Sequence, residues 1–360
     1  MRVALVHDFL TQYGGAEKVL ETFHEIWPSA PIFTLFYNKK IMGDNFAQAD
    51  IRVSPIQNLP WGSKKYRWYL PLMPSAIERF NFKNYDLIIS DCSAYAKGII
   101  THLGTRHFCY LHTPTRYLWS DAHDYIDSLK GGEKIMSKFI APFLNYLRVW
   151  DYQAAQRPDF LMANSQFVAQ RIKHYYQRES KVIYPPVEVN SFKINPKPEK
   201  YFLVVSRLRP YKKVDLAIQA FNHLKIPLKI IGTGNDEGLR KIAGPNIEFL
   251  GFVSDQEKIK YFSQCQALIH PQEEDFGITA VEAMASGRPV IAYQKGGALE
   301  TVKAGVSGEF FSHQSWESLA ETVAKFKSEN FDPQKIKAHA QKFSQARFKK
   351  EIESFIQAHV

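Results

Sequence analysis

Short apolar runs alternate along the whole chain with segments in which apolar residues recur at helical spacing. The short runs predict buried strands, because a parallel strand covered on both faces has no polar side. In the first half of the chain, strands are predicted at Val3–Val6, Ile32–Phe36, Asp86–Ser90, Phe108–Leu111, Phe160–Ala163 and Lys181–Tyr184. In the second half, they are predicted at Tyr201–Val205, Leu228–Ile231, Ile247–Leu250, Ala267–His270, Val290–Tyr293 and Glu309–Phe311. Helices are predicted between them, for example at Ala16–Phe23, Asp215–Asn222, Asp255–Ser263 and Trp316–Lys327. This alternation predicts an α/β protein with parallel sheets and right-handed crossovers.

A proline-rich segment divides the pattern into two halves. Residues 184–198 contain four prolines and read as a connection rather than as a regular element. A chain of 360 residues is long enough for two α/β domains with complete cores. We therefore predict an N-terminal domain at 1–190, a C-terminal domain at 191–345 and a terminal helix at 346–360.

Composition excludes several classes of protein. Hydrophobic residues make up 45% and charged residues 23% of the chain, which is ordinary for a soluble globular protein. The net charge of +10 favours anionic ligands, but there is no basic tail or stripe of the kind that binds nucleic acid. The three cysteines form no Cys-x-x-Cys pair, which argues against a disulfide framework or a zinc knot. Without a signal peptide pattern or an apolar run of about 18 residues, the expected location is the cytoplasm.

Two glutamates follow the predicted strand at Ala267–His270. Glu274 is expected on the loop after the strand, and Glu282 about two turns into a helix that begins near Gly277. Unpaired amides at such a helix start attract phosphate. Two carboxylates placed in this way can hold two hydroxylated ends of one ligand, although an isolated pair of glutamates is more often merely solvated.

A basic loop follows the predicted strand at Tyr201–Val205. Arg207 and Lys212 lie five residues apart on this strand-to-helix connection. A guanidinium fork and an ammonium point charge together suit a diphosphate. Taken alone, such a loop is usually just solvated.

The two clusters together resemble the retaining, nucleotide-sugar-dependent glycosyltransferases of family 4, which have the GT-B fold of two Rossmann-like domains. Arg207, Lys212, Glu274, Glu282 and the Gly296–Glu300 segment follow the family's order. The resemblance covers nearly the whole chain and is strongest over residues 201–308. The segment Tyr110–Trp119 is similar to bacterial mannosyltransferases of surface-polysaccharide synthesis. In this family the terminal helix crosses back onto the first domain, the first domain takes the acceptor and the second takes the donor.

The resemblance also implies roles for individual residues. Arg207 and Lys212 would stabilise the departing diphosphate, Glu274 would hold the sugar and Glu282 the ribose. His112, after a predicted strand, would reach the transferred sugar, although a lone histidine is more often structural. Gly15, at a helix start, would contact donor or acceptor, or else simply make a tight turn. Further donor contacts implied by the family lie at Gly232, Phe252, Val253, Phe276, Gly277 and Ile278.

The function implied is transfer of a hexose, with GDP-mannose the favoured donor, to a lipid-linked or growing glycan. No cofactor and no metal are expected, because the chain has no Asp-x-Asp pair of the kind that holds Mg²⁺ or Mn²⁺ on a diphosphate. A sugar-nucleotide isomerase on the same fold remains an alternative. A basic nucleic-acid-binding protein is a second one, suggested only by the net charge.

Two aromatic segments predict attachment to an anionic membrane surface. Residues 60–73 interleave aromatic rings with Lys64, Lys65 and Arg67, a pattern that suits the level of the lipid headgroups. Residues 139–150 add apolar area, and Pro142 is expected to interrupt any long helix there. The alternative is that both segments pack into the first domain.

Overall fold

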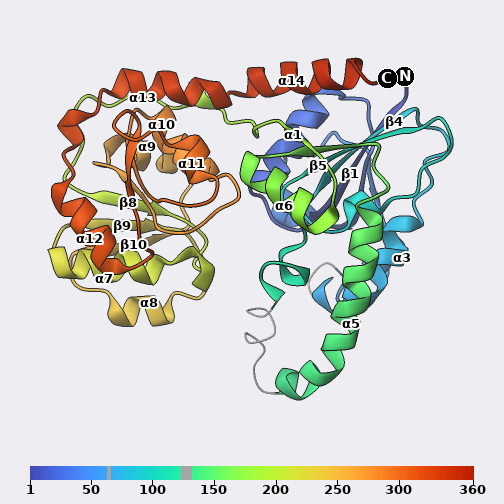
Figure 1. Ribbon diagram of the computed structural model, residues 1–360, viewed down its shortest axis with the longest axis horizontal. Coiled ribbons are helices and arrows are strands. Elements are labelled where there is room, and N and C mark those ends of the chain that lie inside the picture. The colour runs from blue at the N-terminus through green and yellow to red at the C-terminus, as the bar shows by residue number, and fades with distance from the viewer. Residues whose placement is uncertain (63–65, 123–131) are drawn as a thin grey trace. The chain divides into compact units, whose positions relative to one another are not determined.

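The structure is a computed structural model that describes residues 1–62, 66–122 and 132–360, although not the side chains of 67 and 132–141. The chain divides into two compact units, residues 1–184 with 349–360 and residues 185–348 (Figure 1). The boundaries predicted from the sequence lay at 190 and 345, a few residues away from these. The difference arises because the proline-rich connection from Pro185 onward packs with the second unit.

The described part of the first unit contains a seven-stranded parallel sheet in the order β3-β2-β1-β4-β5-β6-β7. The strands are β1 Val3–Leu10, β2 Ile32–Tyr37, β3 Ile51–Val53, β4 Leu87–Cys92, β5 Arg106–Leu111, β6 Phe160–Ala163 and β7 Lys181–Val182. The helices are α1 Gly15–Ile26, α2 Lys39–Met42, α3 Met73–Glu78, α5 Gly132–Ala154 and α6 Gln166–Tyr176, with 3-10 turns at Pro55–Asn58, Tyr66–Leu72, Ala96–Gly98 and Arg116–Leu118.

The second unit contains a six-stranded parallel sheet in the order β10-β9-β8-β11-β12-β13. The strands are β8 Phe202–Val205, β9 Leu228–Ile231, β10 Ile247–Gly251, β11 Leu268–His270, β12 Val290–Tyr293 and β13 Gly308–Phe311. The helices are α7 Val214–Leu224, α8 Glu237–Ile242, α9 Asp255–Gln264, α10 Ile278–Ala285, α11 Ala298–Thr301, α12 Trp316–Lys325 and α13 Pro333–Ala340, with 3-10 turns at Val189–Ser191, Pro210–Lys212, Ser328–Asn330 and Gln341–Phe343. The last helix, α14 Gln345–Gln357, begins in the second unit and belongs to the first unit from Lys349 onward.

The apolar runs of the sequence form the strands because helices cover both faces of each sheet. Every residue of β4 is buried, as its run of apolar side chains requires. In the second unit, α7 and α12 pack side by side and contribute Phe221 and Leu319 to the core with the strands (Figure 1). The predicted α/β fold of two parallel sheets is thus confirmed.

Three local features differ from, or extend, the sequence pattern. The short strand β3 was missed because only three residues pair at this edge. Helix α5 continues through Pro142, contrary to the expected interruption. Buried Leu144 and Leu147 pack with Leu118 beside the proline, and this packing compensates for one lost backbone hydrogen bond. The terminal helix α14 carries Phe355 against Phe108 and Phe160 of the first unit.

Candidate functional site

The second sheet has one point, between β8 and β11, at which the order of its strands reverses. There the chain leaves β8 in one direction and β11 in the other. In doubly wound sheets the loops at such a reversal form a crevice. Open α/β sheets bind ligands at this point, outside the carboxyl ends of the strands. The two loops, residues 206–213 and 271–277, are the ones that carry the predicted cations and the first predicted glutamate.

Lys212 and Glu274 meet across this crevice. Nζ of Lys212 donates a hydrogen bond to Oε1 of Glu274, and both side chains keep about a fifth of their surface exposed, 17% and 20%. Nε2 of Gln272 donates to the same oxygen at 2.9 Å. The carboxylate is therefore held from two directions while its charge remains accessible from solvent.

His270 and Gln272 lie buried beneath this pair, and the sequence analysis identified neither of them. Gln272 Nε2 lies 3.3 Å from Nδ1 of His270. Burial, with a smaller contribution from the charge of Lys212, lowers the pKa of His270 to about 3, so its ring is neutral at physiological pH. The only sequence signal was their position at the end of an apolar strand, which is shared with many structural residues.

The start of α10 requires a glycine. Gly277 has φ +90°, and a Cβ built there would lie 3.3 Å from Nε2 of His270. No side chain caps this helix, so its first amides remain suited to an anion. Ile278 is the first helical residue and is half-buried. Phe276 is buried with its ring 5.5 Å from that of Phe343, so only its backbone can meet a ligand.

A turn after β12 supports the loop that carries Glu274. The N–H of Gly297 donates to the carbonyl of Glu274 at 2.8 Å. A Cβ on Gly296 would lie 2.5 Å from that same carbonyl oxygen, and a Cβ on Gly297 would meet Asp275 O at 2.5 Å. Glycines are required here because the two backbones touch, which explains why Gly296–Gly297 accompanies the glutamate motif.

Glu282 lies on α10 and is almost fully buried. Its Oε1 is 3.3 Å from Nζ of Lys258 on α9, which also pairs with Asp255 at 3.0 Å. Burial opposes the charge of Lys258, but Glu282 and Asp255 outweigh it and raise the pKa of the lysine. The carboxylate oxygens of Glu282 can accept hydrogen bonds from hydroxyl groups. Lys258 was not identified from the sequence.

The remaining predicted donor residues lie on loops after β8, β9 and β10. Arg207 is exposed directly beyond β8. Gly232 has φ +146°, and a Cβ there would overlap the carbonyl of Ser206 at 1.7 Å, so this glycine lets the β8 and β9 loops touch. Phe252 is 84% exposed and Val253 is half-buried.

In the first unit, His112 follows β5 and contacts a buried carboxylate. Its Nε2 lies 2.6 Å from Oδ1 of Asp91 at the end of β4. His7 of β1 lies on the other side of Asp91, with Nδ1 2.9 Å from Oδ2, and its Nε2 is 3.8 Å from Glu17. Gly15 begins α1 and is half-buried. The sequence identified His112 and Gly15 but missed the acidic and basic residues around them.

A fully buried ion pair anchors the segment that follows His112. Lys97 donates to Asp151 at 2.6 Å, and neither side chain is more than 1% exposed. Thr115 and Trp119 each donate to the same carboxylate at 2.7 Å. Tyr176 donates to it as well, at 2.7 Å. The loop after β5 is thereby fixed at two points beyond His112.

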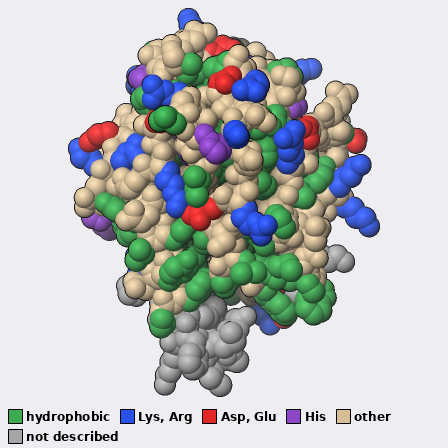
Figure 2. Space-filling view, turned by 90° about the vertical axis from the view of Figure 1, so that its right-hand side faces the viewer, with side chains coloured by type: hydrophobic (Ala, Val, Ile, Leu, Met, Phe, Trp, Pro, Cys, Tyr) green, Lys and Arg blue, Asp and Glu red, His purple; other side chains and the backbone are tan. Residues whose placement is uncertain are grey.

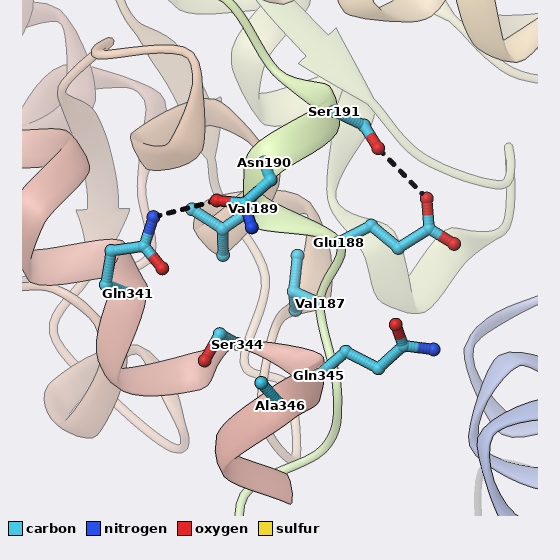
Figure 3. A pocket seen from close by; sticks show the side chains of 9 residues that line it. All are labelled: Val187, Glu188, Val189, Asn190, Ser191, Gln341, Ser344, Gln345 and Ala346. Atoms are coloured by element: carbon cyan, nitrogen blue, oxygen red, sulfur yellow. Dashed lines mark hydrogen bonds between the residues drawn. The ribbon is translucent and has the colours of Figure 1, made fainter. Parts of the chain in front are cut away.

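A separate pocket of about 370 Å³ lies in the second unit where the connection from the first unit meets the start of α14 and the residues just before it (Figure 3). Residues 187–191 line it together with Gln341, Ser344, Gln345 and Ala346. The N–H of Val187 donates to Phe343 O at 2.9 Å, and Gln341 Nε2 donates to Asn190 Oδ1 at 3.2 Å. None of the predicted site residues is among the residues that line this pocket.

Two further properties concern residues 1–62, 66–122 and 132–360, which the structure describes. Within these ranges, no group of three or more His, Cys, Asp or Glu side chains is arranged to hold a metal ion. Over the same residues, no helix combines the length and the apolar character needed to cross a membrane.

Two family models match successive parts of this chain. The model described as Glycosyltransferase Family 4 matches residues 13–191, and the one described as Glycosyl transferases group 1 matches residues 187–343. The join between the two matches coincides with the proline-rich connection.

Curated relatives are similar over part of their length. Human alpha-1,3/1,6-mannosyltransferase ALG2 is 30% identical over 207 residues, which cover 47% of this chain and 50% of the relative. The O-antigen chain mannosyltransferase C of Escherichia coli is 30% identical over 106 residues, which cover 27% and 29%. The chain spans about half the length or less of the curated relatives it matches.

Among solved structures, the Anabaena protein Alr3699/HepE in complex with UDP has a TM-score of 0.75 at 20% identity. The match covers 99% of this chain and 100% of that one. At this level of identity the likeness concerns the fold.

Proposed function

We propose that this chain, which belongs to the GT-B glycosyltransferases of the family 4 type, transfers a hexose from a nucleotide-sugar to a glycan acceptor. GDP-mannose is the favoured donor, and a lipid-linked or growing polysaccharide chain is the favoured acceptor. The observation that carries the proposal is the contact of Lys212 with Glu274 at the strand-order crevice of the second sheet. Mannosyl transfer is favoured because two relatives of about 30% identity bear mannosyltransferase names.

The crevice has the charges that a nucleoside diphosphate requires. Arg207 and Lys212 supply cations for the diphosphate, and the free amides at the start of α10 supply further donors. When the donor enters, Lys212 moves its hydrogen bond from Glu274 to a phosphate oxygen. Glu274 is then free to accept hydrogen bonds from sugar hydroxyls, while Gln272 keeps Oε1 in place.

The proposed reaction breaks the bond between the anomeric carbon and the diphosphate oxygen. The acceptor hydroxyl forms the new bond on the same face of the sugar, and its proton passes to the departing diphosphate. The leaving group gains negative charge during this step, so Arg207 and Lys212 bind the transition state more tightly than the substrate. His112 is proposed to contact the sugar, and Gly15 to contact the donor or the acceptor.

The nucleoside is proposed to bind beside α10 and the loop after β10. Glu282 accepts hydrogen bonds from the ribose hydroxyls in place of its contact with Lys258. Backbone groups at Phe252 and Val253 receive the base. We further propose that the reaction needs no metal ion and no cofactor, because fixed cations and helix amides supply the positive charge.

Attachment to an anionic membrane is proposed on exposed aromatic side chains of the first unit. Trp61 and Trp68 are 60% and 63% exposed, and their ring centroids are 5.8 Å apart. Figure 2 shows hydrophobic side chains gathered on the lower part of the face that it draws. The predicted cations Lys64 and Lys65 lie outside the described residues, as does the side chain of Arg67. A membrane site suits a lipid-linked acceptor, since it confines enzyme and acceptor to one surface.

The deciding experiment is a panel of GDP-, UDP- and ADP-sugars. Thermal shift identifies the nucleotide that binds, and NMR of the consumed donor identifies the products. Release of GDP from GDP-mannose, with the mannosyl carbon joined to acceptor or water, supports transfer. Conversion into another sugar nucleotide without release of GDP would instead establish the isomerase. Binding to DNA that weakens steeply with salt, without any donor being consumed, would favour the nucleic-acid binder.

A further inference from the structure

Three neighbouring strands of the first sheet bring titratable side chains together. His7 lies on β1, Asp91 near the end of β4 and His112 just beyond β5, and these strands are adjacent in the sheet. Glu17, in the first turn of α1, completes the cluster through His7. Three of the four side chains are at most 4% exposed, whereas that of His112 is 14% exposed. His112 is thus the member of the cluster that a substrate can reach.

Asp91 contacts the two histidines differently. Its Oδ1 lies 2.6 Å from Nε2 of His112 in hydrogen-bonding geometry. Its Oδ2 lies 2.9 Å from Nδ1 of His7, but the angles are unsuited to a hydrogen bond. The contact with His7 is therefore one between charges, while the directed hydrogen bond of this carboxylate goes to His112.

The charges of the cluster determine which atoms carry protons. Burial opposes a charge on His7, but Asp91 and Glu17 outweigh it and raise the pKa of His7 to about 10. Burial also opposes a charge on Asp91, but the two histidines outweigh it and lower the pKa of Asp91. An ionised carboxylate only accepts hydrogen bonds, so Nε2 of His112 must carry the hydrogen in their contact.

We propose that Asp91 is a positioning residue that sets the tautomer and ring orientation of His112, so that Nδ1 is the atom presented to the substrate. The inference rests on the proposed function only in assigning a sugar oxygen as the partner of Nδ1. The remaining contacts of His112 favour a fixed ring. Its carbonyl accepts a hydrogen bond from Asn164 at 2.9 Å, and Tyr110 packs against the ring with centroids 5.4 Å apart.

A competing explanation is that Asp91 serves only to neutralise buried His7. The two explanations differ in what happens when both groups are removed. If neutralisation is the whole role, adding His7→Gln should restore the kcat and the His112 tautomer that Asp91→Asn alters, because no buried cation is then left uncompensated. If Asp91 positions His112, the double variant should remain as impaired as Asp91→Asn. Because Glu17 is buried beside His7, a triple variant that also carries Glu17→Gln removes the remaining buried charge and so guards against misfolding.

The first test observes the ring of His112 directly by NMR of protein with ¹⁵N-labelled histidines. The chain has twelve histidines, and His112→Ala identifies the signal in question. In the wild type, we expect His112 to carry a proton on Nε2 throughout the pH range. In Asp91→Asn and in the double variant, we expect the nitrogen shifts to move toward a mixture of tautomers. Unchanged His112 shifts in both variants would overturn the inference.

The second test is kinetic. Asp91→Asn should lower kcat by about 10- to 100-fold, the size typical when a group that orients a histidine is lost. GDP affinity should stay within about threefold, because the nucleotide is assigned to the second unit. In a His112→Ala background, Asp91→Asn should lower kcat little further, because Asp91 is proposed to act through His112. The positioning role would be refuted if the effects of Asp91→Asn and His112→Ala on kcat were fully additive. Recovery of kcat when His7→Gln is added to Asp91→Asn would also refute it. If the wild type consumes no donor, the proposed function fails, whereas the NMR comparison still decides the role of Asp91.

Discussion

Replacing Lys212 by alanine separates catalysis from stability at the crevice of the second sheet. Lys212 and Glu274 form a partly exposed pair, with 17% and 20% of their side chains accessible. Pairs of this kind contribute about 0.2–1 kcal/mol to folding. Glu274 also keeps its hydrogen bond from Gln272 when the lysine is gone. We therefore expect the melting temperature of Lys212→Ala to change only slightly.

Turnover should respond much more strongly than stability. In the proposed reaction the lysine meets the charge that develops on the diphosphate. Loss of one preorganised donor of this kind lowers kcat by about 10²–10³-fold, or about 2.7–4 kcal/mol. Arg207→Ala should have an effect of similar size. Lys212→Arg should retain more activity than Lys212→Ala, because the charge remains while the geometry changes.

The assay is the release of GDP from GDP-mannose in the presence of an acceptor, with initial rates over a range of donor concentrations. Lys225→Gly is a matched control, since it removes one exposed lysine at the far end of α7, where φ is +56° and glycine is well accommodated. This control should keep wild-type turnover. The reasoning is refuted if Lys212→Ala and Arg207→Ala both retain kcat within about threefold of the wild type.

Three further outcomes are expected. Glu274→Ala should lower kcat because the glutamate is proposed to contact the reacting sugar. Glu282→Ala should mainly weaken GDP binding, since the proposed ribose contacts are nearly equal in ground and transition states. Unchanged GDP affinity of Glu282→Ala by calorimetry would contradict the ribose assignment. Turnover should persist in EDTA, and activity that disappears with EDTA and returns with Mn²⁺ would disprove metal independence. Replacing Lys64, Lys65 and Arg67 together by glutamate should release the protein from anionic vesicles at low salt while GDP binding is kept, so equal sedimentation of this variant and the wild type would exclude the patch.

Strand positions followed from the sequence because burial on both faces of a parallel sheet demands continuous apolar runs. The prediction failed where that demand is weak or opposed. β3 pairs through only three residues at a sheet edge, so its pattern does not differ from that of a loop. Pro142 reads as a helix breaker, yet the contacts of Leu144 and Leu147 with Leu118 favour continuation of α5.

The polar partners within the candidate site were the least predictable part. Lys212 and Glu274 are 62 residues apart, and both were singled out as ligand groups, but their contact with each other was not foreseen. Gln272 and His270 carry no motif of their own, and Lys258 looks like any helical lysine. Lys97 and Asp151, 54 positions apart in the sequence, likewise form a fully buried ion pair that was not predicted. Nothing in the local sequence distinguishes these side chains from solvated ones.

Sequence alone therefore determined the α/β class, the two-part division and the loops that carry the proposed site residues. Each of these depends on local periodicity or on a motif carried within one segment. Tertiary structure alone decided which side chains share a carboxylate, as Lys212 and Gln272 share Glu274 and as the two histidines share Asp91. The reason is that parallel strands bring the ends of distant segments together. Charge and burial determine which groups hold protons only when those side chains are in contact.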